Sequence, residues 1–277
     1  MYYMDDSVDG RCKCTVANWT GVIYKIPRDD LSRCQERSEL KQSGVYFLFG
    51  ASENDDQLVY VGQAGSRKNG KGILLRLQEH DNPKEDYWNN AVVITTQNNS
   101  FGPTEISYLE NRFHQLAQDA NRYKLMNSLQ PYRGRVTEEK EVEMAEFIDL
   151  TTLIIGALGY RVFMPLVPKK NRGGKTPSDV LHFAPNRYNA TAVRTSEEFV
   201  LLKGSQISPT ISKACSPAIN KNREKFASKV SPDWVTTEDI PFGSSSAAAG
   251  FVGGCNLSGN QVWVDDNGVR LGELLMK

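Results

Sequence analysis

The sequence lacks the features that mark a secreted or membrane-bound chain. Its first residues, MYYMDD, contain neither the basic region nor the apolar run of a signal peptide. The longest apolar run lies around residues 153–158 and is far too short to span a bilayer. We therefore expect a cytoplasmic protein without a membrane partner.

Cysteine is scarce as well. The five cysteines form an odd and scattered set, which does not predict a disulfide framework. Cys12 and Cys14 would lie on one face of a strand, but no Cys or His pair of matching spacing follows to complete a zinc site. We expect buried, reduced thiols instead.

The chain has no excess of charge of either sign, since 33 Lys and Arg residues balance 33 Asp and Glu residues. Net charge therefore says nothing about nucleic acid. The distribution is uneven, however, because residues 161–229 contain thirteen basic and four acidic side chains. Such asymmetry is typical of solvated faces, or of a surface that binds a phosphate backbone, and both interpretations stay open.

What the chain does contain is the composition of a soluble globular protein of 277 residues, long enough for one large domain or two smaller ones. Residues 91–96 have the clearest strand pattern, and Pro103 suits the start of a helix over 104–120. A second amphipathic helix is expected over 138–158. Shorter patterns predict strands within 11–27, 189–202 and 261–264, and helices at 29–42, 218–230 and 244–252.

Together these elements predict an α+β fold. The composition of the chain predicts where its domains begin and end. The stretch 168–187 is rich in Gly, Pro and basic residues and predicts a linker. We expect a core domain over 44–135, a strand and helix extension packed on it over 1–43, and a connecting helix region over 136–167. A smaller α+β domain is expected over 188–277.

The core domain opens with a predicted β-hairpin over 44–62 that carries Tyr46 and Tyr60. A glycine-rich basic loop follows and contains Arg67, Lys68 and Lys71. Strand tyrosines are ordinarily half-buried sheet residues. Placed beside clustered positive charge, they also indicate a site for a phosphate group.

Three further features of this region could support chemistry. Arg76 and His80 are four residues apart, so they share a helix face, which spacing alone favours as an exposed face. Glu110 lies at the margin of an apolar stripe, where an unpartnered carboxylate is costly and a hard cation would be a partner. His114 follows one turn later on the same side, where it could pair with Glu110 as a ligand, although we expect solvent exposure instead. Asn127 ends the segment.

Taken together, these residues resemble the motifs of the GIY-YIG nuclease family. Gly44-Val45-Tyr46 and Tyr60-Val61-Gly62 are similar to its two tripeptides, with valine in place of isoleucine in both. Arg76 and His80 resemble its catalytic arginine and a frequent histidine, Glu110 its metal-binding glutamate, and Asn127 its closing asparagine. The resemblance spans about residues 43 to 130. It implies a small three-stranded antiparallel sheet flanked by helices.

The resemblance also implies an activity: hydrolysis of DNA phosphodiester bonds by an endonuclease, in repair, restriction or defence. One divalent metal is implied, with Mg²⁺ the first candidate and Mn²⁺ the second. In that scheme Tyr46, helped by Tyr60 or His80, takes part in activating water. Arg76 stabilises charge on the phosphate, Glu110 holds the metal, and Asn127 keeps the site in shape.

Some alternatives stay open. The segment before residue 76 is longer than in compact members of the family, so Arg67 competes with Arg76 for the role of catalytic arginine; we favour Arg76 because of its histidine partner. A non-cleaving nucleic-acid-binding protein on the same fold is the second hypothesis for function. An unrelated α+β protein with chance tyrosines is the third.

The C-terminal part resembles a domain of unassigned function that often follows such nucleases in bacterial chains. The likeness covers about residues 188 to 277 and rests on segments 199–205, 244–249 and 262–271. It implies association with a nuclease and no known chemistry. A role in gripping DNA is a hypothesis motivated by the positive charge of residues 161–229.

Overall fold

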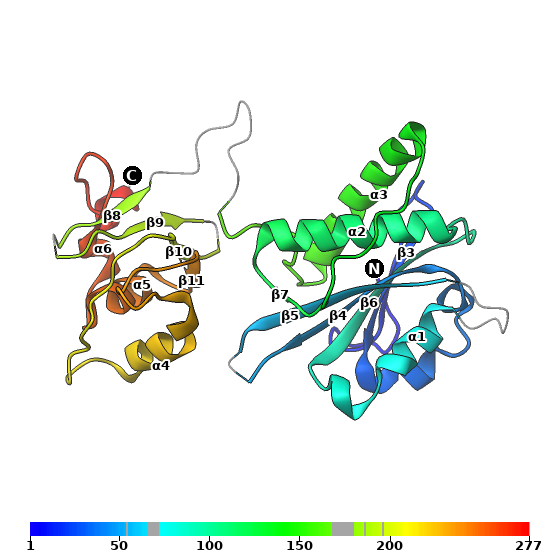
Figure 1. Cartoon of the computed structure of the whole chain (residues 1–277), viewed down its shortest axis with the longest axis horizontal. Helices are drawn as coiled ribbons and strands as arrows, with labels where there is room; N and C mark the ends of the chain where they lie inside the picture. Colours follow the sequence, from blue (N-terminus) through cyan, green and yellow to red (C-terminus); the bar gives the residue numbers. More distant parts are fainter. Residues whose placement is uncertain (54, 66–71, 168–179, 186, 196, 277) are drawn as a thin grey trace. The chain divides into compact units, whose positions relative to one another are not determined.

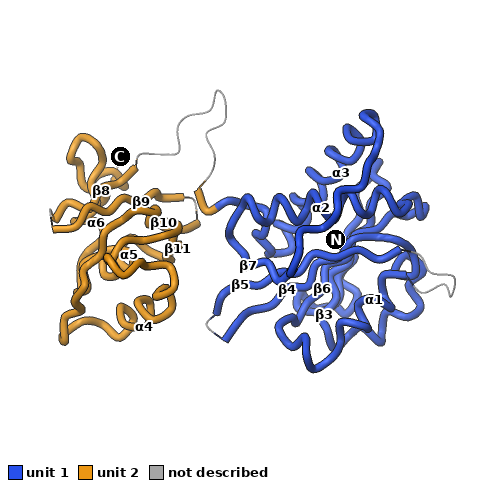
Figure 2. Tube along the Cα trace, in the orientation of Figure 1, with its two compact units in different colours: residues 1–165 blue, residues 166–277 orange. Residues whose placement is uncertain are grey.

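The computed structural model describes residues 1–53, 55–65, 72–167, 180–185, 187–195 and 197–276. The chain divides into two compact units, residues 1–165 and 166–277 (Figure 2). Each unit combines helices with one mainly antiparallel sheet, so the predicted α+β class is confirmed (Figure 1). Within the described ranges, no helix has both the length and the apolar character needed to cross a membrane.

Unit 1 is built on a seven-stranded sheet in the order β1-β2-β3-β6-β4-β5-β7. Neighbouring strands are antiparallel except for the parallel pair β5 and β7. The strands are β1 (Tyr2–Tyr3), β2 (Cys12–Cys14), β3 (Gly21–Pro27), β4 (Gly44–Ala51), β5 (Gln57–Ala64), β6 (Trp88–Thr96) and β7 (Lys124–Leu125). The predicted hairpin and the predicted strand at 91–96 are both present.

The expectation of a small three-stranded sheet needs correction. Strands β6, β4 and β5 are adjacent, but β3 pairs with β6 along its whole length and continues the sheet into β2 and β1. The reason is that β3 is almost entirely buried and β-branched at several positions, so it belongs in a sheet interior. Residues 1–43 therefore supply strands to the sheet as well as packing against it.

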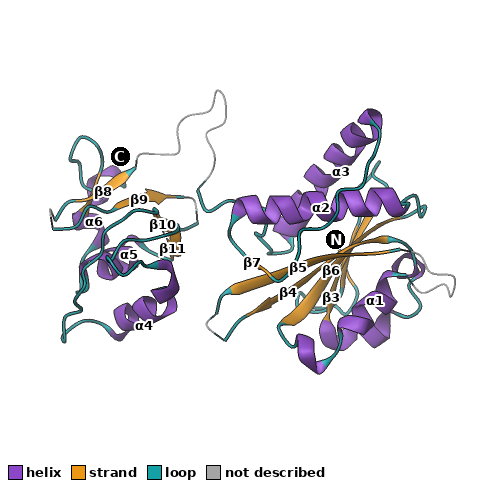
Figure 3. Ribbon diagram, in the orientation of Figure 1, coloured by secondary structure: helices purple, strands orange, loops and turns teal. Residues whose placement is uncertain are grey.

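Helices cover both faces of this sheet. Strand β4 is apolar at every position from Val45 to Phe49, so side chains on both of its faces must be buried. Its odd-numbered side chains pack with helices α2 (Pro103–Ala120) and α3 (Glu138–Ala157). Its even-numbered side chains pack with α1 (Ile73–His80) and the 3₁₀ helices η1 (Arg28–Cys34) and η2 (Ser38–Lys41). Figure 3 shows α1 and α2 on opposite sides of the strands.

The two long helices begin and end close to their predicted bounds. Pro103 occupies the first turn of α2, and Asn121 ends it in the left-handed conformation at φ 47°. Thr137 caps α3 by accepting a hydrogen bond from the Lys140 backbone N–H. The helix expected at 29–42 is instead the two 3₁₀ helices η1 and η2, and a third, η3 (Pro83–Glu85), follows α1.

The cysteines of unit 1 lie inside the protein. Cys12, Cys14 and Cys34 are buried free thiols, and the Sγ atoms of Cys12 and Cys14 are 3.8 Å apart. Burial raises the pKa of Cys14 to about 12, so this thiol is protonated and unreactive at neutral pH.

Unit 2 contains a five-stranded antiparallel sheet in the order β11-β10-β9-β8-β12. The strands are β8 (Leu181–Phe183), β9 (Thr191–Arg194), β10 (Phe199–Leu201), β11 (Ile240–Phe242) and β12 (Trp263–Val264). The helices are α4 (Pro217–Lys225), η4 (Ala227–Lys229), α5 (Ser245–Gly253), α6 (Gly259–Val262) and α7 (Leu271–Leu274). Trp263 is completely buried at the centre of this unit's core.

The predicted boundary of the second domain also needs correction. Strand β8 lies inside the segment expected to be a linker, and its Leu181 and Phe183 are buried in the core of unit 2. A three-residue strand is too short to leave a periodic signal beside a Gly- and Pro-rich stretch. Unit 2 therefore begins before residue 188. Residues 168–179 and 186 of the predicted linker lie outside the described residues.

Candidate functional site

The two tyrosines of the hairpin lie side by side on the face of the sheet that α1 covers. In the β4–β5 register Tyr46 is opposite Gly62, and Tyr60 is opposite Leu48. The tyrosine rings stack with centroids 6.2 Å apart. Tyr46 has no exposed surface, whereas Tyr60 is half-buried, so the two phenols have different access to solvent.

The glycines of the two tripeptides are explained by close packing. A Cβ on Gly62 would lie 2.4 Å from the Oη atom of Tyr46, and one on Gly44 would lie 2.2 Å from the carbonyl oxygen of Ile94. Real Cβ atoms do not approach other atoms so closely, so neither position has room for a side chain. Gly62 thus creates the space in which the Tyr46 hydroxyl sits.

His80 joins the tyrosines from the last turn of α1. Its Nε2 atom lies 2.8 Å from Tyr46 Oη, and its ring centroid is 5.2 Å from that of Tyr60. Only 5% of His80 is exposed, so the expectation of an exposed helix face is wrong for this residue. The reason is helical spacing, since His80 follows the buried Leu77 by three residues and shares its face.

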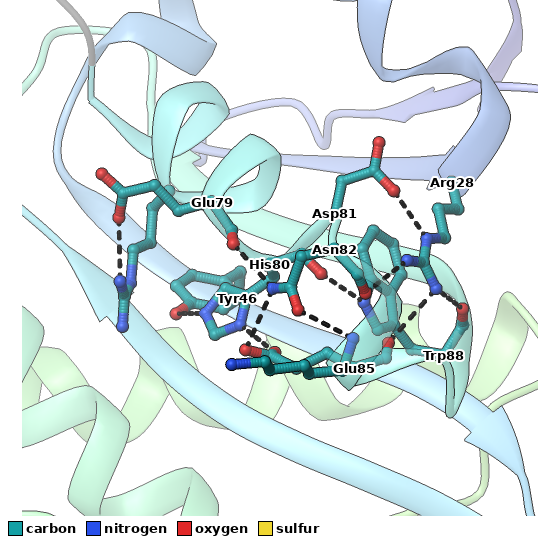
Figure 4. Close-up of polar contacts among 10 residues, drawn as sticks. Arg28, Tyr46, Glu79, His80, Asp81, Asn82, Glu85 and Trp88 are labelled. Carbon is teal, nitrogen blue, oxygen red and sulfur yellow. Dashed lines mark hydrogen bonds and ion pairs between the residues drawn. The ribbon is translucent and has the colours of Figure 1, made fainter.

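The second ring nitrogen of His80 meets a residue that the sequence did not single out. The Nδ1 atom lies 2.5 Å from Glu85 Oε2 (Figure 4). Glu85 ends the short η3 helix that follows α1. No helical or strand period relates positions 80 and 85, so the sequence offered no signal for this contact.

Arg76 occupies the outer side of the same helix. Its side chain is 37% exposed and forms an ion pair with Glu79 at 2.8 Å. Burial, and then the neighbouring Tyr60, raise the pKa of Tyr46, whereas the positive charge of Arg76 lowers it. Arg76 is therefore close enough to influence the phenol. The other predicted phosphate-binding residues, Arg67, Lys68 and Lys71, lie outside the described residues.

Glu110 approaches from α2, which covers the opposite face of the sheet. Burial raises the pKa of its carboxyl group to about 7, although hydrogen bonding from Gln63 and the charge of Arg76 act in the other direction. No ion pair between described residues involves Glu110. Gln63 lies near the end of β5, beyond the two residues that pair with β7, so the contact is at the sheet edge.

The carboxylate of Glu110 limits which kinds of metal site are possible here. Across the described parts of the chain, no three His, Cys, Asp or Glu side chains group closely enough to enclose an ion. A zinc-type cage is thus not formed by these residues. Mg²⁺, by contrast, keeps most of its waters and is held by one or two carboxylates together with substrate phosphate. A desolvated carboxylate that forms no ion pair with a described residue fits that role.

His114, one turn after Glu110, does not have the exposure that we expected. It is 6% exposed, and its Nδ1 atom forms no hydrogen bond with any described residue. Burial lowers the pKa of the imidazole, so the ring is neutral at pH 7. The expectation of solvent exposure is wrong because the buried face of α2 is wider than its aliphatic residues indicate. Tyr108 and Asn111 are buried on this helix as well.

Asn127 holds the strand that carries Tyr60. Its Oδ1 atom accepts a hydrogen bond from the Val61 N–H at 3.0 Å, and its Nδ2 donates to the Val61 carbonyl at 2.7 Å. The side-chain amide thereby continues the pairing that β7 makes with Leu58 and Val59. Asn127 therefore satisfies the backbone hydrogen-bonding groups at the edge of β5, next to Tyr60.

The structure therefore brings some of the predicted site residues together and separates others. Tyr46, Tyr60 and His80 form one contact cluster, with Arg76 beside it. Glu110 is on another helix, where its charge raises the pKa of Tyr46 and the charge of Arg76 lowers the pKa of Glu110. Asn127 acts through the β5 backbone.

Comparison with known proteins assigns part of unit 2. Residues 181–275 match the family model described as a domain of unknown function (DUF4357). This segment starts at β8 and includes all the strands of unit 2, so it agrees with a C-terminal domain of unassigned function. No curated protein and no solved structure matches the chain.

Proposed function

We propose that the chain is a metal-dependent endonuclease that hydrolyses phosphodiester bonds of DNA. The contact between Tyr46 Oη and His80 Nε2 carries the proposal. A phenol is a weak base while it is protonated, and burial makes ionisation of Tyr46 harder still. An imidazole within hydrogen-bonding distance supplies the proton acceptor that such a phenol needs if it is to take part in activating water.

The groups around this pair have complementary roles. The Arg76 guanidinium has an exposed portion and can bind two phosphate oxygens, which stabilises the charge that develops during attack on phosphorus. The half-buried Tyr60 contributes the second phenol of the cluster. Glu110 would hold the divalent ion, Mg²⁺ or Mn²⁺, which when bound supplies charge neutralisation at the phosphate.

Nicking of supercoiled plasmid in the presence of Mg²⁺ tests this proposal. We expect Arg76→Ala and Glu110→Gln each to reduce the rate about a hundredfold or more, as loss of a transition-state contact does. Asp119→Asn, an exposed substitution on the same helix as Glu110, and Arg135→Ala, at an exposed arginine of unit 1, are matched controls that should nick normally.

Two results would overturn the proposal. Activity that survives both Arg76→Ala and Glu110→Gln would show that the site is elsewhere. Tight binding of DNA by the wild-type chain, without cleavage of plasmid, single-stranded or branched substrates, would support the non-cleaving nucleic-acid-binding protein instead.

We also propose that unit 2 contributes positive charge to DNA binding. The basic helix α4 is only partly available for this role, because Arg223 Nε donates to the Phe251 carbonyl at 2.8 Å and burial lowers the pKa of Arg223 to about 10. Lys229 forms an ion pair with Glu238 at 3.3 Å. The exposed Lys213 and Lys221 are better candidates for contacts with phosphates.

A further inference from the structure

Glu85, His80 and Tyr46 form a continuous chain of polar contacts inside unit 1. His80 Nδ1 lies 2.5 Å from Glu85 Oε2, and His80 Nε2 lies 2.8 Å from Tyr46 Oη. Figure 4 shows the imidazole between the carboxylate and the phenol. Because both ring nitrogens are engaged, the position of the ring proton decides what His80 can do for Tyr46.

The carboxylate dictates that position. Desolvation raises the pKa of Glu85, but hydrogen bonding from His80 and the charge of His80, with smaller effects of Asn82 and Arg76, outweigh it and hold the pKa below its ordinary value. An ionised carboxylate only accepts hydrogen bonds. His80 must therefore donate from Nδ1, and in the neutral ring Nε2 is left as the acceptor for the Tyr46 hydroxyl.

Glu85 is itself held in place by the short turn that follows α1. Asn82 caps this turn, since its Oδ1 accepts from the Lys84 backbone N–H at 3.0 Å. The Asn82 Nδ2 donates to the Glu79 carbonyl at 3.0 Å and approaches Glu85 Oε1 at 3.4 Å. These contacts fix the carboxylate relative to the last turn of α1.

A second set of contacts ties the turn to the sheet. Arg28 donates to the backbone carbonyls of Asn82, Glu85 and Trp88, each at 3.2 Å, and stacks on the Trp88 ring with its guanidinium carbon 4.8 Å from the centroid. Trp88 in turn donates from Nε1 to the His80 carbonyl at 3.2 Å. Hydrogen bonds thus connect the turn to α1 on one side and, through Arg28 and Trp88, to the sheet on the other.

We propose that Glu85 is a positioning residue that keeps His80 in the Nδ1–H tautomer, so that Nε2 can take the proton of Tyr46. This inference rests on the proposed function, in which Tyr46 takes part in activating water. The Tyr46 proton moves to Nε2, the resulting imidazolium keeps its Nδ1–H on Glu85, and the phenolate takes one proton from the attacking water as the water oxygen bonds to phosphorus. The P–O bond to the leaving oxygen breaks, that oxygen takes a proton from solvent, and His80 returns its added proton to solvent.

The tautomer can be measured without any substrate. The chain has three histidines, so ¹⁵N-labelled histidine gives three assignable ring systems. At a pH where the rings are neutral, we expect His80 Nδ1 in wild-type protein to show the shift and one-bond coupling of a protonated nitrogen, and Nε2 the shift of an unprotonated one. A wild-type His80 protonated at Nε2 would overturn the proposal, whether or not the protein cleaves DNA.

Variants of Glu85 separate positioning from charge. In Glu85→Ala we expect mixed His80 tautomers, unchanged signals from His114 and His182, and a kcat for nicking about tenfold to a hundredfold lower with unchanged affinity for DNA. Glu85→Gln keeps an acceptor oxygen, so it should retain the Nδ1–H tautomer and lose less activity. A kcat within twofold of wild type in Glu85→Ala would contradict the role.

A matched control exists in unit 2, where His182 Nε2 lies 2.8 Å from Asp266 Oδ1 in an exposed pair. Asp266→Ala removes the same type of contact and should leave nicking unchanged. If wild-type protein does not cleave DNA but Glu85→Ala still releases the His80 tautomer, the proposed function fails while the hold of Glu85 on His80 stands.

Discussion

Both units contain buried hydroxyls that donate to the backbone, such as Thr95 in unit 1, but unit 1 also contains a buried imidazole between two ionisable groups. In unit 2 the buried Ser205, Ser208 and Thr236 each donate to a backbone carbonyl, at 3.1, 2.7 and 2.9 Å. In unit 1 the buried His80 contacts two ionisable side chains, Tyr46 and Glu85. A hydroxyl that is closed onto the backbone stabilises a turn, whereas an imidazole between two ionisable groups can move a proton. The contrast therefore supports the proposal that places the reaction in unit 1.

The largest effect should come from filling the space beside Tyr46. Gly62→Ala places a methyl group 2.4 Å from Tyr46 Oη, so the fully buried ring must leave the position in which its hydroxyl contacts His80. We expect a loss of about 3 kcal/mol in the free energy of unfolding and nicking reduced at least a hundredfold, as removal of a general acid or base does. Gly65→Ala is the control, because no described residue other than its chain neighbours has an atom within 4 Å of its added Cβ. Equal behaviour of the two variants would remove the argument from packing.

Next in size is the loss of the edge contact on β5. Asn127→Ala leaves the Val61 N–H and carbonyl without their partners, which costs about 2 kcal/mol of unfolding free energy. Asn127→Asp keeps the acceptor and loses the donor, so it should be destabilised nearly as much. Urea unfolding measures both. If Asn127→Asp were as stable as wild type, the donation to the Val61 carbonyl would be unimportant.

A smaller effect depends on pH. The pKa of Glu110 is raised from 4.5 to about 7, so its protonated form is favoured in the folded chain. The stability that it contributes is complete below about pH 4.5 and is lost as pH rises through about 7. Allowing for partial solvent exposure, Glu110→Gln should gain about 1–2 kcal/mol over wild type at pH 8 and little at pH 4.

Urea unfolding of Glu110→Gln and wild type at both pH values provides the measurement, with the exposed Asp119→Asn as control. Added Mg²⁺ should reduce the advantage of Glu110→Gln at pH 8, because a cation stabilises the wild-type carboxylate. If the difference in unfolding free energy between Glu110→Gln and wild type did not vary with pH, the Glu110 carboxylate would not be desolvated.

In unit 2, removing a buried hydroxyl should lower the free energy of unfolding and leave the nicking rate unchanged. Thr236→Val removes the hydroxyl that donates to the Leu202 carbonyl and accepts from the Ser205 N–H, which costs about 1 kcal/mol. Nicking per folded molecule should be unchanged. A fall in kcat for Thr236→Val would break the contrast between the two units.

The exposed lysines of unit 2 provide the mildest test. Lys213→Glu combined with Lys221→Glu should weaken binding of duplex DNA and reduce the slope of log K against log salt by about 2, since each phosphate contact contributes nearly one unit. Lys41→Glu, at an exposed lysine of unit 1, is the control for charge reversal itself. An unchanged slope would exclude these two side chains from the DNA contact.

Much of the framework was predictable because it depends on local signals. Pro103 and the periodic apolar side chains after it define α2, and the β-branched run at 91–96 defines the centre of β6. Strand β8 was missed because three residues beside a Gly-rich stretch carry no periodic signal. The three-stranded sheet was an underestimate because pairing of β3 with β6 joins segments about seventy residues apart.

The sequence by itself determined the order of the site motifs: two tyrosines on paired strands, an arginine and a histidine one helical turn apart, a glutamate at the margin of an amphipathic helix, and a later asparagine. Each of these follows from local spacing and from turn composition. Only the tertiary structure decided which of them touch. His80 is buried because α1 lies on the sheet, and Glu85 reaches His80 because Arg28, from a segment before the hairpin, holds the turn that carries it. Contacts of that kind depend on how elements pack, and no residue period records them.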